Sequence, residues 1–165
     1  MTTPQTKSMY LRNFVFGVED SLVSTVGLLS GVAIGGMAQK EILLTGIVLI
    51  FVEAISMAAG SFLSESSAEE YETRQDTNGG RGYPSAAIMF ISYFLSGFIP
   101  LAPYVFLPIT QAFPTSIVLS IISLALLGMF AARLSGTRPV GSMIRMALIG
   151  GLAIAVGVLA GALIG

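Results

Sequence analysis

The chain has 165 residues, of which 54% are hydrophobic and only 10% are charged. Its mean hydropathy is +0.85, and soluble domains carry about 25% charged residues, so the composition is that of a membrane protein. The net charge of −1 offers no basic surface for nucleic acid. Because the chain has no Cys and no His, disulfides, zinc fingers and any Cys or His catalysis are excluded.

Stretches without charge divide the chain into candidate spans of roughly the 20 residues that a membrane helix needs. The stretch 82–132 is long enough for two helices, and four prolines predict a break and a turn in its middle: Pro100, Pro103, Pro108 and Pro114. We therefore predict an all-α fold, with residues 1–165 as a single transmembrane domain. Its five spans are expected at about 16–37, 42–64, 84–106, 113–134 and 142–164.

The distribution of basic residues predicts the orientation of these spans. With the N-terminus inside, only Lys40 among the eight basic residues lies outside, as the positive-inside rule favours. The N-terminus and a short acidic link, 65–83, are then cytoplasmic, and the C-terminus is outside or luminal. The short, polar N-terminal segment without a transit-like sequence favours a prokaryotic inner membrane over a vacuole.

Two carboxylates lie in or beside the apolar spans. Asp20 stands near the inner end of the first span, and Glu53 lies about midway along the second. Burying a carboxylate in a membrane costs several kcal/mol, so such residues usually face a partner, water or an ion. No Lys or Arg stands at the depth of Glu53, which favours an ion or proton site there, although an inert, protonated carboxyl is the alternative. Asp20 and its neighbour Glu19 could also be helix-start acids favoured by the helix dipole.

Helical spacing extends this pattern along the second span. Glu53, Met57, Ser61 and Ser64 fall on one stripe of a helix, and Asp20, Ser24, Gly27 and Gly31 form a stripe on the first. If the stripes face each other, they line one polar path. A thioether among oxygen donors shifts preference from Mg²⁺ or Ca²⁺ toward softer ions such as Fe²⁺, although Met57 could simply fill a gap.

The second helix is expected to continue into the cytoplasm with an acidic segment. Two interpretations are open: a solvated helical face, or a cluster that attracts and captures metal cations near the path. The residues concerned are Glu65, Glu69, Glu70 and Glu72.

Four segments resemble the vacuolar iron transporter family, in order and over nearly the whole chain. DSLVSTVGLLSGVA (20–33) is similar to its first helix, AISMAAGSFLSESS (54–67) to its second, GFIPLAPYVF (97–106) to its proline turn, and LALLGMFAARLSG (124–136) to the end of its fourth. The resemblance implies a five-helix homodimeric transporter that exchanges Fe²⁺, and often Mn²⁺, for protons. It also implies that Asp20 and Met57 correspond to the family's first-helix Asp and second-helix Met, with Glu53 one turn earlier.

The sequence departs from that family in two places. Ser61 stands where the family often has Glu, and the helical metal-binding insert between the second and third helices is reduced to about residues 65–83. The resemblance therefore implies a short member without the large cytoplasmic domain.

We predict a proton-coupled exporter of Fe²⁺ or Mn²⁺, with metal and protons competing for Asp20 and Glu53 and with Met57 as a further residue of the pathway. Such a transporter is no enzyme, holds no permanent cofactor and works in a lipid bilayer. The alternatives are a channel or transporter for another cation on the same scaffold, or a membrane anchor for an iron-storage partner.

Overall fold

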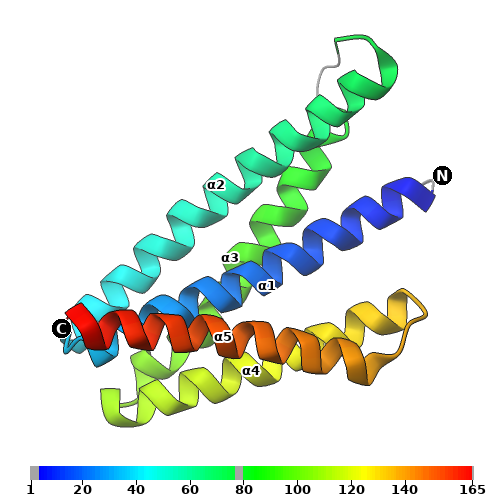
Figure 1. Cartoon of the computed structure of the whole chain (residues 1–165). Coiled ribbons are helices and arrows are strands. Elements are labelled where there is room, and N and C mark those ends of the chain that lie inside the picture. The colour runs from blue at the N-terminus through cyan, green and yellow to red at the C-terminus, as the bar shows by residue number, and fades with distance from the viewer. Residues whose placement is uncertain (1–3, 77–79, 165) are drawn as a thin grey trace.

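The computed structural model describes residues 4–76 and 80–164, which form five α-helices connected by short turns (Figure 1). All five are long and apolar enough to cross a membrane, which confirms the predicted all-helical membrane fold. Their bounds are α1 Pro4–Ile34, α2 Gln39–Thr73, α3 Gly82–Phe106, α4 Ile109–Leu134 and α5 Pro139–Ile164.

The helices are longer than the predicted spans, mainly at one end of the bundle. Helix α1 begins twelve residues before the predicted span at 16, and α2 continues nine residues beyond the predicted end at 64. Hydropathy marks only the apolar part of a helix, whereas backbone hydrogen bonds continue through its polar ends. Residues 65–73 of the predicted link 65–83 are thus the last turns of α2, and residues 77–79 lie outside the described part.

The proline-rich segment makes one turn, and three of its four prolines lie within helices. Pro100 and Pro103 are inside α3 and Pro114 is inside α4, so the expectation that all four mark the break was wrong. The turn is at Leu107 and Pro108. Because Pro108 has no N–H, it leaves the Tyr104 carbonyl without its helical donor, and the Gln39 side chain donates to that carbonyl at 2.6 Å. Neighbouring helices commonly satisfy such carbonyls in membrane proteins.

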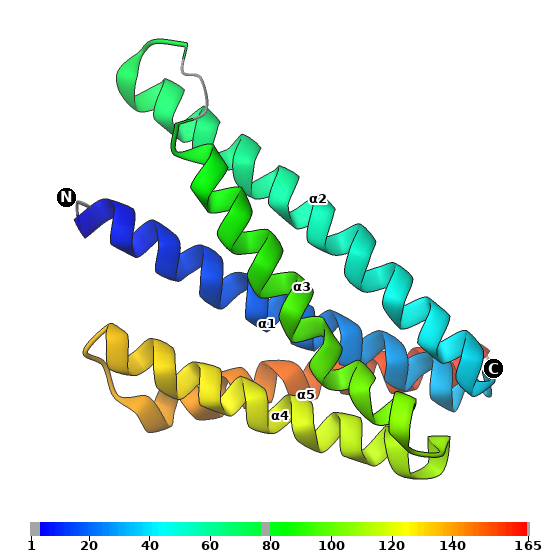
Figure 2. The same cartoon turned by 180° about the vertical axis from the view of Figure 1, so that it is seen from behind.

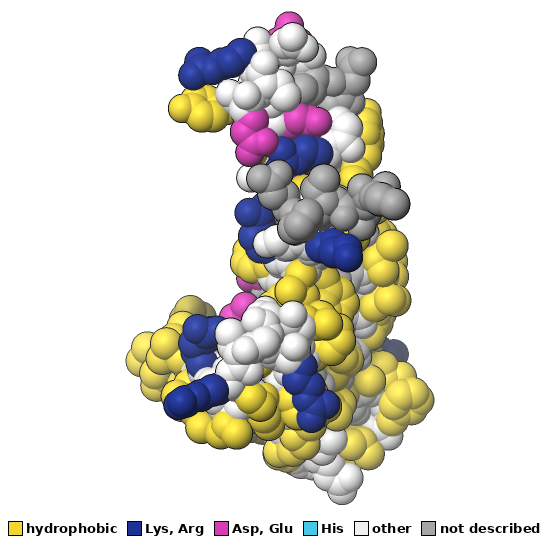
Figure 3. All heavy atoms as spheres, turned by 90° about the vertical axis from the view of Figure 1, so that its right-hand side faces the viewer, with side chains coloured by type: hydrophobic (Ala, Val, Ile, Leu, Met, Phe, Trp, Pro, Cys, Tyr) yellow, Lys and Arg dark blue, Asp and Glu magenta, His cyan; other side chains and the backbone are white. Residues whose placement is uncertain are grey.

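The helix ends form two groups at opposite ends of the bundle. The N-terminal end of α1, the α2–α3 link and the α4–α5 turn lie together, opposite the other two turns and the end of α5 (Figures 1 and 2). Seen from the first end, Lys and Arg side chains are spread over the exposed surface, with acidic side chains among those of the α2–α3 region (Figure 3). This is the end that the positive-inside rule predicts to be cytoplasmic.

Helix α1 is central, and it packs backbone to backbone against α5. A methyl group on Gly31 would lie 2.7 Å from the Gly157 carbonyl oxygen. A methyl group on Gly157 or Gly161 would lie closer still to a carbonyl oxygen of α1. Small residues allow this approach, which gives close van der Waals contact without side chains between the helices. Gly27 and Gly31 therefore face α5, so the expectation that their stripe lines a path against α2 was wrong for these two glycines.

Candidate functional site

A buried tyrosine joins three helices at the middle of the membrane-spanning region. The Tyr93 hydroxyl on α3 donates a hydrogen bond to the Glu53 carboxylate on α2, and it also lies 2.7 Å from the Ser24 hydroxyl on α1. A second bond, from the Ser21 hydroxyl to the Tyr93 carbonyl at 2.7 Å, fixes α1 against the same turn of α3. Glu53 is half-buried and accepts this bond from the Tyr93 hydroxyl, and such a bond helps a carboxylate to be tolerated without a basic partner.

Asp20 lies on α1 one turn before Ser24 and is half-buried. Its carboxylate interacts electrostatically with those of Glu53 and Glu19. A cation between these carboxylates would remove the repulsion between their charges. Within residues 4–76 and 80–164, no three acidic side chains come together as a metal site, so Asp20 and Glu53 form a pair rather than a complete ligand shell.

Glu19 points to a different part of the molecule from Glu53. It lines a cavity of about 470 Å³ between α1 and the α4–α5 turn, together with Arg12, Arg145 and the hydroxyl-bearing Ser135 and Thr137. Glu19 therefore shares the region of Asp20 but not the Tyr93 network.

The other residues of the α2 stripe face a second cavity, which lies between α1 and α2 toward the N-terminal end of α1. Met57, Ser61 and Ser64 line this cavity of about 520 Å³, with Asn13 from α1 and Met89 from α3. The Ser61 hydroxyl donates to the Asn13 side-chain oxygen at 3.2 Å. Three residues of the predicted α2 stripe thus face one cavity. On α1, however, they meet Asn13 and not the predicted stripe that begins at Asp20.

The acidic segment at the end of α2 is largely paired with arginines. The Glu65 carboxylate is buried, forms an ion pair with Arg12 of α1, and lies 3.9 Å from the Arg81 guanidinium. Arg81 also contacts Glu72 at 2.6 Å, and its backbone N–H donates to Glu69 at 3.1 Å. The hydrogen bond that Arg81 donates to the Glu72 carboxylate raises the pKa of Arg81 above its usual value, so the guanidinium stays charged at physiological pH. Of the four predicted capture residues, Glu70 and Glu72 are exposed, Glu69 is half-buried, and Glu65 does not lie on a solvated face.

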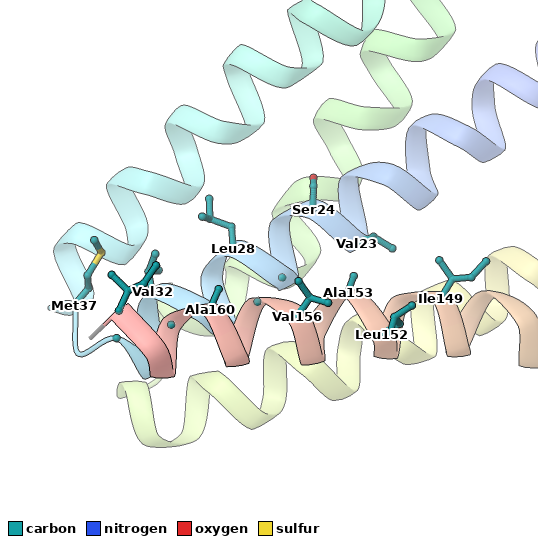
Figure 4. Close-up of a pocket in the computed structure, with 16 residues that line it drawn as sticks. Val23, Ser24, Leu28, Val32, Met37, Ile149, Leu152, Ala153, Val156 and Ala160 are labelled. Carbon is teal, nitrogen blue, oxygen red and sulfur yellow. The ribbon is translucent and has the colours of Figure 1, made fainter.

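A further cavity is apolar and is not part of this polar region. It is an open groove of about 910 Å³ between α1 and α5, lined by Leu28, Leu152, Val156 and the glycines of the close contact. Figure 4 shows Ser24 at its edge with the hydroxyl pointing away from α5. Such a groove suits a lipid chain or another apolar helix far better than an ion.

Three residues of the Tyr93 network and of the cavity beside Met57 were not predicted from the sequence. Tyr93 and Met89 lie in a stretch of α3 without charged residues, and Asn13 precedes the first uncharged stretch. The only available signal was that a buried tyrosine hydroxyl or asparagine amide needs a hydrogen-bond partner. Which partner that is depends on tertiary packing.

Comparison with known proteins agrees with this architecture. The model of the VIT family matches residues 11–79 and 73–162. A protein named vacuolar iron transporter homolog 1, from Arabidopsis thaliana, is 33% identical over 162 positions, covering 91% of this chain and 80% of the relative. The vacuolar iron transporter of Centaurea cyanus is 43% identical, but over only 46% of this chain and 31% of its own length.

A further relative shows that longer proteins share this scaffold. Vacuolar iron transporter 1 of Tulipa gesneriana is 25% identical over 203 positions, covering 87% of this chain and 82% of the relative. Because 203 positions exceed the 165 residues of this chain, the tulip protein carries segments that this chain lacks. These relatives are plant proteins with vacuolar names, so they give no support to the predicted prokaryotic inner membrane. With the family model matched over most of its length and five membrane-spanning helices in place, this chain is a member of the VIT family.

Proposed function

We propose that this chain is a transporter of divalent metal ions, Fe²⁺ or Mn²⁺, which it moves out of the cytoplasm in exchange for protons. The relatives named as vacuolar iron transporters support iron as a substrate. The observation that carries the proposal is the carboxylate of Glu53, held by the Tyr93 hydroxyl at mid-membrane and interacting with Asp20. Acidic residues placed in this way typically mark ion or proton pathways.

The exchange would follow from competition between metal and protons for the same oxygens. A metal ion binds ionised carboxylates, so its arrival at Asp20 and Glu53 releases the protons that they hold, and metal affinity rises with pH. The Tyr93 hydroxyl donates to Glu53 and lies beside Ser24. It would therefore keep the carboxylate oriented both when metal is bound and when protons are bound. Met57, one turn from Glu53, would add a thioether that disfavours Mg²⁺.

A homodimer would complete the ligand shell. One protomer brings together two carboxylates, whereas first-row divalent ions usually take four to six ligands. A twofold axis beside α1 and α2 would bring two copies of Asp20 and Glu53 together, which is the simplest symmetric arrangement of two chains. Alternating access of this site to the two sides would then move the metal.

Uptake by proteoliposomes tests the proposal. The protein is reconstituted with a pH dye inside the vesicles, Fe²⁺ or Mn²⁺ is added outside, and metal entry and internal pH are followed together. We expect metal entry with opposite proton movement, and loss of both with Glu53→Gln. Glu41→Gln is the matched control, since Glu41 is exposed and caps α2, and Gln serves in the same capping position.

Each alternative function predicts a different result. Metal-independent proton flux would favour a channel on the same scaffold. The membrane-anchor alternative would be favoured by two results together: no movement of metal or protons through well-inserted protein, and neutral variants of Asp20 and Glu53 that behave like the wild type. Unchanged proton coupling in Glu53→Gln, with metal transport intact, would overturn the proposed role of this carboxylate.

A further inference from the structure

The cavity between α1 and the α4–α5 turn has the donors of an anion site. Its walls come from α1, from the end of α4 and from the first turns of α5, which lie together at one end of the bundle (Figures 1 and 2). The lining includes Arg12 and Arg145 and the hydroxyl groups of Ser135, Thr137 and Ser142. Guanidinium and hydroxyl groups are the donors that side chains offer to phosphate oxygens.

The arginines around the α4–α5 turn are not neutralised by neighbouring carboxylates. Arg12 is paired with Glu65 of α2, but in the part of the chain that the structure describes Arg133, Arg138 and Arg145 form no ion pair. Acidic side chains gather mainly toward the α2–α3 link, whereas Lys and Arg also lie over the α4–α5 turn (Figure 3). The turn therefore carries an excess of positive charge that an external anion would balance.

One carboxylate also lines the cavity and limits where an anion can lie. Glu19 is half-buried and comes seven residues after Arg12, which places it roughly 10 Å further along α1 from the N-terminal end. Like charges repel, so an anion close to Glu19 would be disfavoured. A bound phosphate is thus expected beside the α4–α5 turn, near Arg145 and Thr137, and not at the depth of Glu19.

Arg145 stands where the apolar surface of α5 meets its polar end. Its neighbours Ile144 and Leu148 are 55% and 68% exposed, as is usual for side chains that face lipid. Long basic side chains near the ends of such helices extend their charged groups toward the membrane–water interface, where the lipid phosphates lie. Phe16 and Met146 also line the cavity and give it apolar contacts for the glycerol and first acyl carbons of a lipid. These features favour a lipid headgroup over an anion from solution.

We propose that this cavity binds the phosphate group of an anionic phospholipid, with the Arg145 guanidinium as the main ligand and the Thr137 and Ser142 hydroxyls as further donors. Basic residues at a membrane surface attract anionic lipids, and basic pockets between membrane helices bind their headgroups. The bound phosphate would connect the first turns of α5 to α1. The site shares no residue with the Tyr93 network, so it stands or falls independently of the proposed metal transport.

Lipid binding is measured by native mass spectrometry of the full-length protein purified in detergent. The probes have the same acyl chains: dioleoylphosphatidylglycerol, which is anionic, and dioleoylphosphatidylcholine, which is zwitterionic. We expect the wild type to bind phosphatidylglycerol roughly tenfold more tightly than phosphatidylcholine. Arg145→Gln should weaken phosphatidylglycerol binding by about tenfold, the scale of one charge-assisted hydrogen bond. Glu19→Gln should tighten it, because a like charge near the phosphate is gone.

Arg74→Gln is the matched control, because it removes the same charge outside the cavity. Arg74 is exposed at the same end of the bundle, and its guanidinium lies over the Tyr71 ring of α2. A general attraction between the protein and anionic lipid would weaken equally in Arg74→Gln and Arg145→Gln, whereas a site at Arg145 weakens only in the second. Arg145 is exposed, so its substitution should leave folding intact. Glu19→Gln adds an independent effect of opposite sign.

Inorganic phosphate distinguishes a lipid headgroup from a free phosphate ion. If millimolar phosphate leaves phosphatidylglycerol bound to the wild type, the lipid assignment is supported. If it displaces the lipid, the site belongs to a free anion and the lipid assignment is overturned. Equal binding of the two lipids by the wild type, equal losses in Arg145→Gln and Arg74→Gln, or weaker binding in Glu19→Gln would each contradict the site.

Discussion

The Tyr93 hydroxyl of α3 is hydrogen-bonded to the Glu53 carboxylate of α2, across a separation of 40 residues in the chain. Tyr93 is completely buried, and through Ser24 it reaches α1 as well. One phenol thereby connects α3 to α1 and α2, the two helices that contain every predicted pathway residue. The position of the Glu53 carboxylate therefore depends on how α3 packs against α2. A shift between the two helices would change the hydrogen bond that Glu53 accepts.

Removing this hydroxyl should impair transport more than folding. Tyr93→Phe keeps the ring and its packing, but Glu53 and Ser24 lose their common partner. We expect Mn²⁺ uptake to fall by about tenfold and the stability of the protein by roughly 0.5–1.5 kcal/mol, the usual net contribution of one hydrogen bond. Proteoliposome uptake and thermal unfolding followed by circular dichroism measure the two effects.

Tyr83→Phe is the control, because Tyr83 is exposed at the start of α3 and makes its ring contact with Phe62. Equal uptake by Tyr93→Phe and the wild type would show that the network holds the helices together without acting on the ion.

Met57 should affect the choice of ion more than the rate of transport. Met57→Leu conserves volume and apolar character but removes the thioether. If the sulfur contacts the metal, preference for Fe²⁺ and Mn²⁺ over Mg²⁺ should decrease by roughly tenfold, as for the loss of a weak ligand. The measurement is competition of Mg²⁺ against Mn²⁺ uptake in proteoliposomes.

Met37→Leu serves as the matched variant, since Met37 is exposed in the α1–α2 turn. Unaltered selectivity in Met57→Leu would return Met57 to the gap-filling role that the sequence left open.

The membrane itself explains why much of the fold could be predicted. In a bilayer every backbone group must be paired within the chain, so uncharged stretches of sufficient length become helices almost regardless of detail. The same constraint made Glu53 conspicuous, because a carboxylate within an apolar span is costly unless it faces a partner, water or an ion. The polar continuation of α2 followed from the helical spacing of Glu65, Glu69 and Glu72.

Contacts between distant segments could not be predicted in this way. Arg12 and Glu65 are 53 residues apart, and nothing in their local sequence pairs them. Gly27 and Gly31 were recognisable as part of one stripe of the first helix, but spacing alone does not say whether α2 or α5 covers it. In lipid all neighbours are apolar, so hydropathy does not rank helix partners, and side-chain fit decides.

The α1–α5 contact should be intolerant of even one methyl group. In Gly31→Ala the new methyl would lie 2.7 Å from the Gly157 carbonyl oxygen, and neither backbone can yield easily. We expect a loss of about 1–3 kcal/mol in stability, the usual cost of overpacking. The measurement is thermal unfolding in detergent by circular dichroism.

Gly151→Ala is the matched control in α5, since a methyl group there meets nothing within 4 Å. Alanine is favoured over glycine in a helix by up to about 1 kcal/mol, so this variant should be neutral or slightly more stable. A melting temperature for Gly31→Ala at or above the wild-type value would contradict the close backbone contact.

The predicted orientation can be tested with single cysteines, because the chain has none of its own. Asp76 and Lys40 are both exposed and lie at opposite ends of the bundle, one after α2 and the other in its first turn. With the basic end in the cytoplasm, a membrane-impermeant maleimide should label Lys40→Cys in intact cells and Asp76→Cys only after permeabilisation. The reverse pattern would place the N-terminal end of α1 and the acidic end of α2 on the outer side, which would contradict the predicted orientation. Labelling of both in permeabilised cells confirms that each thiol is reactive, and the unsubstituted chain gives the background.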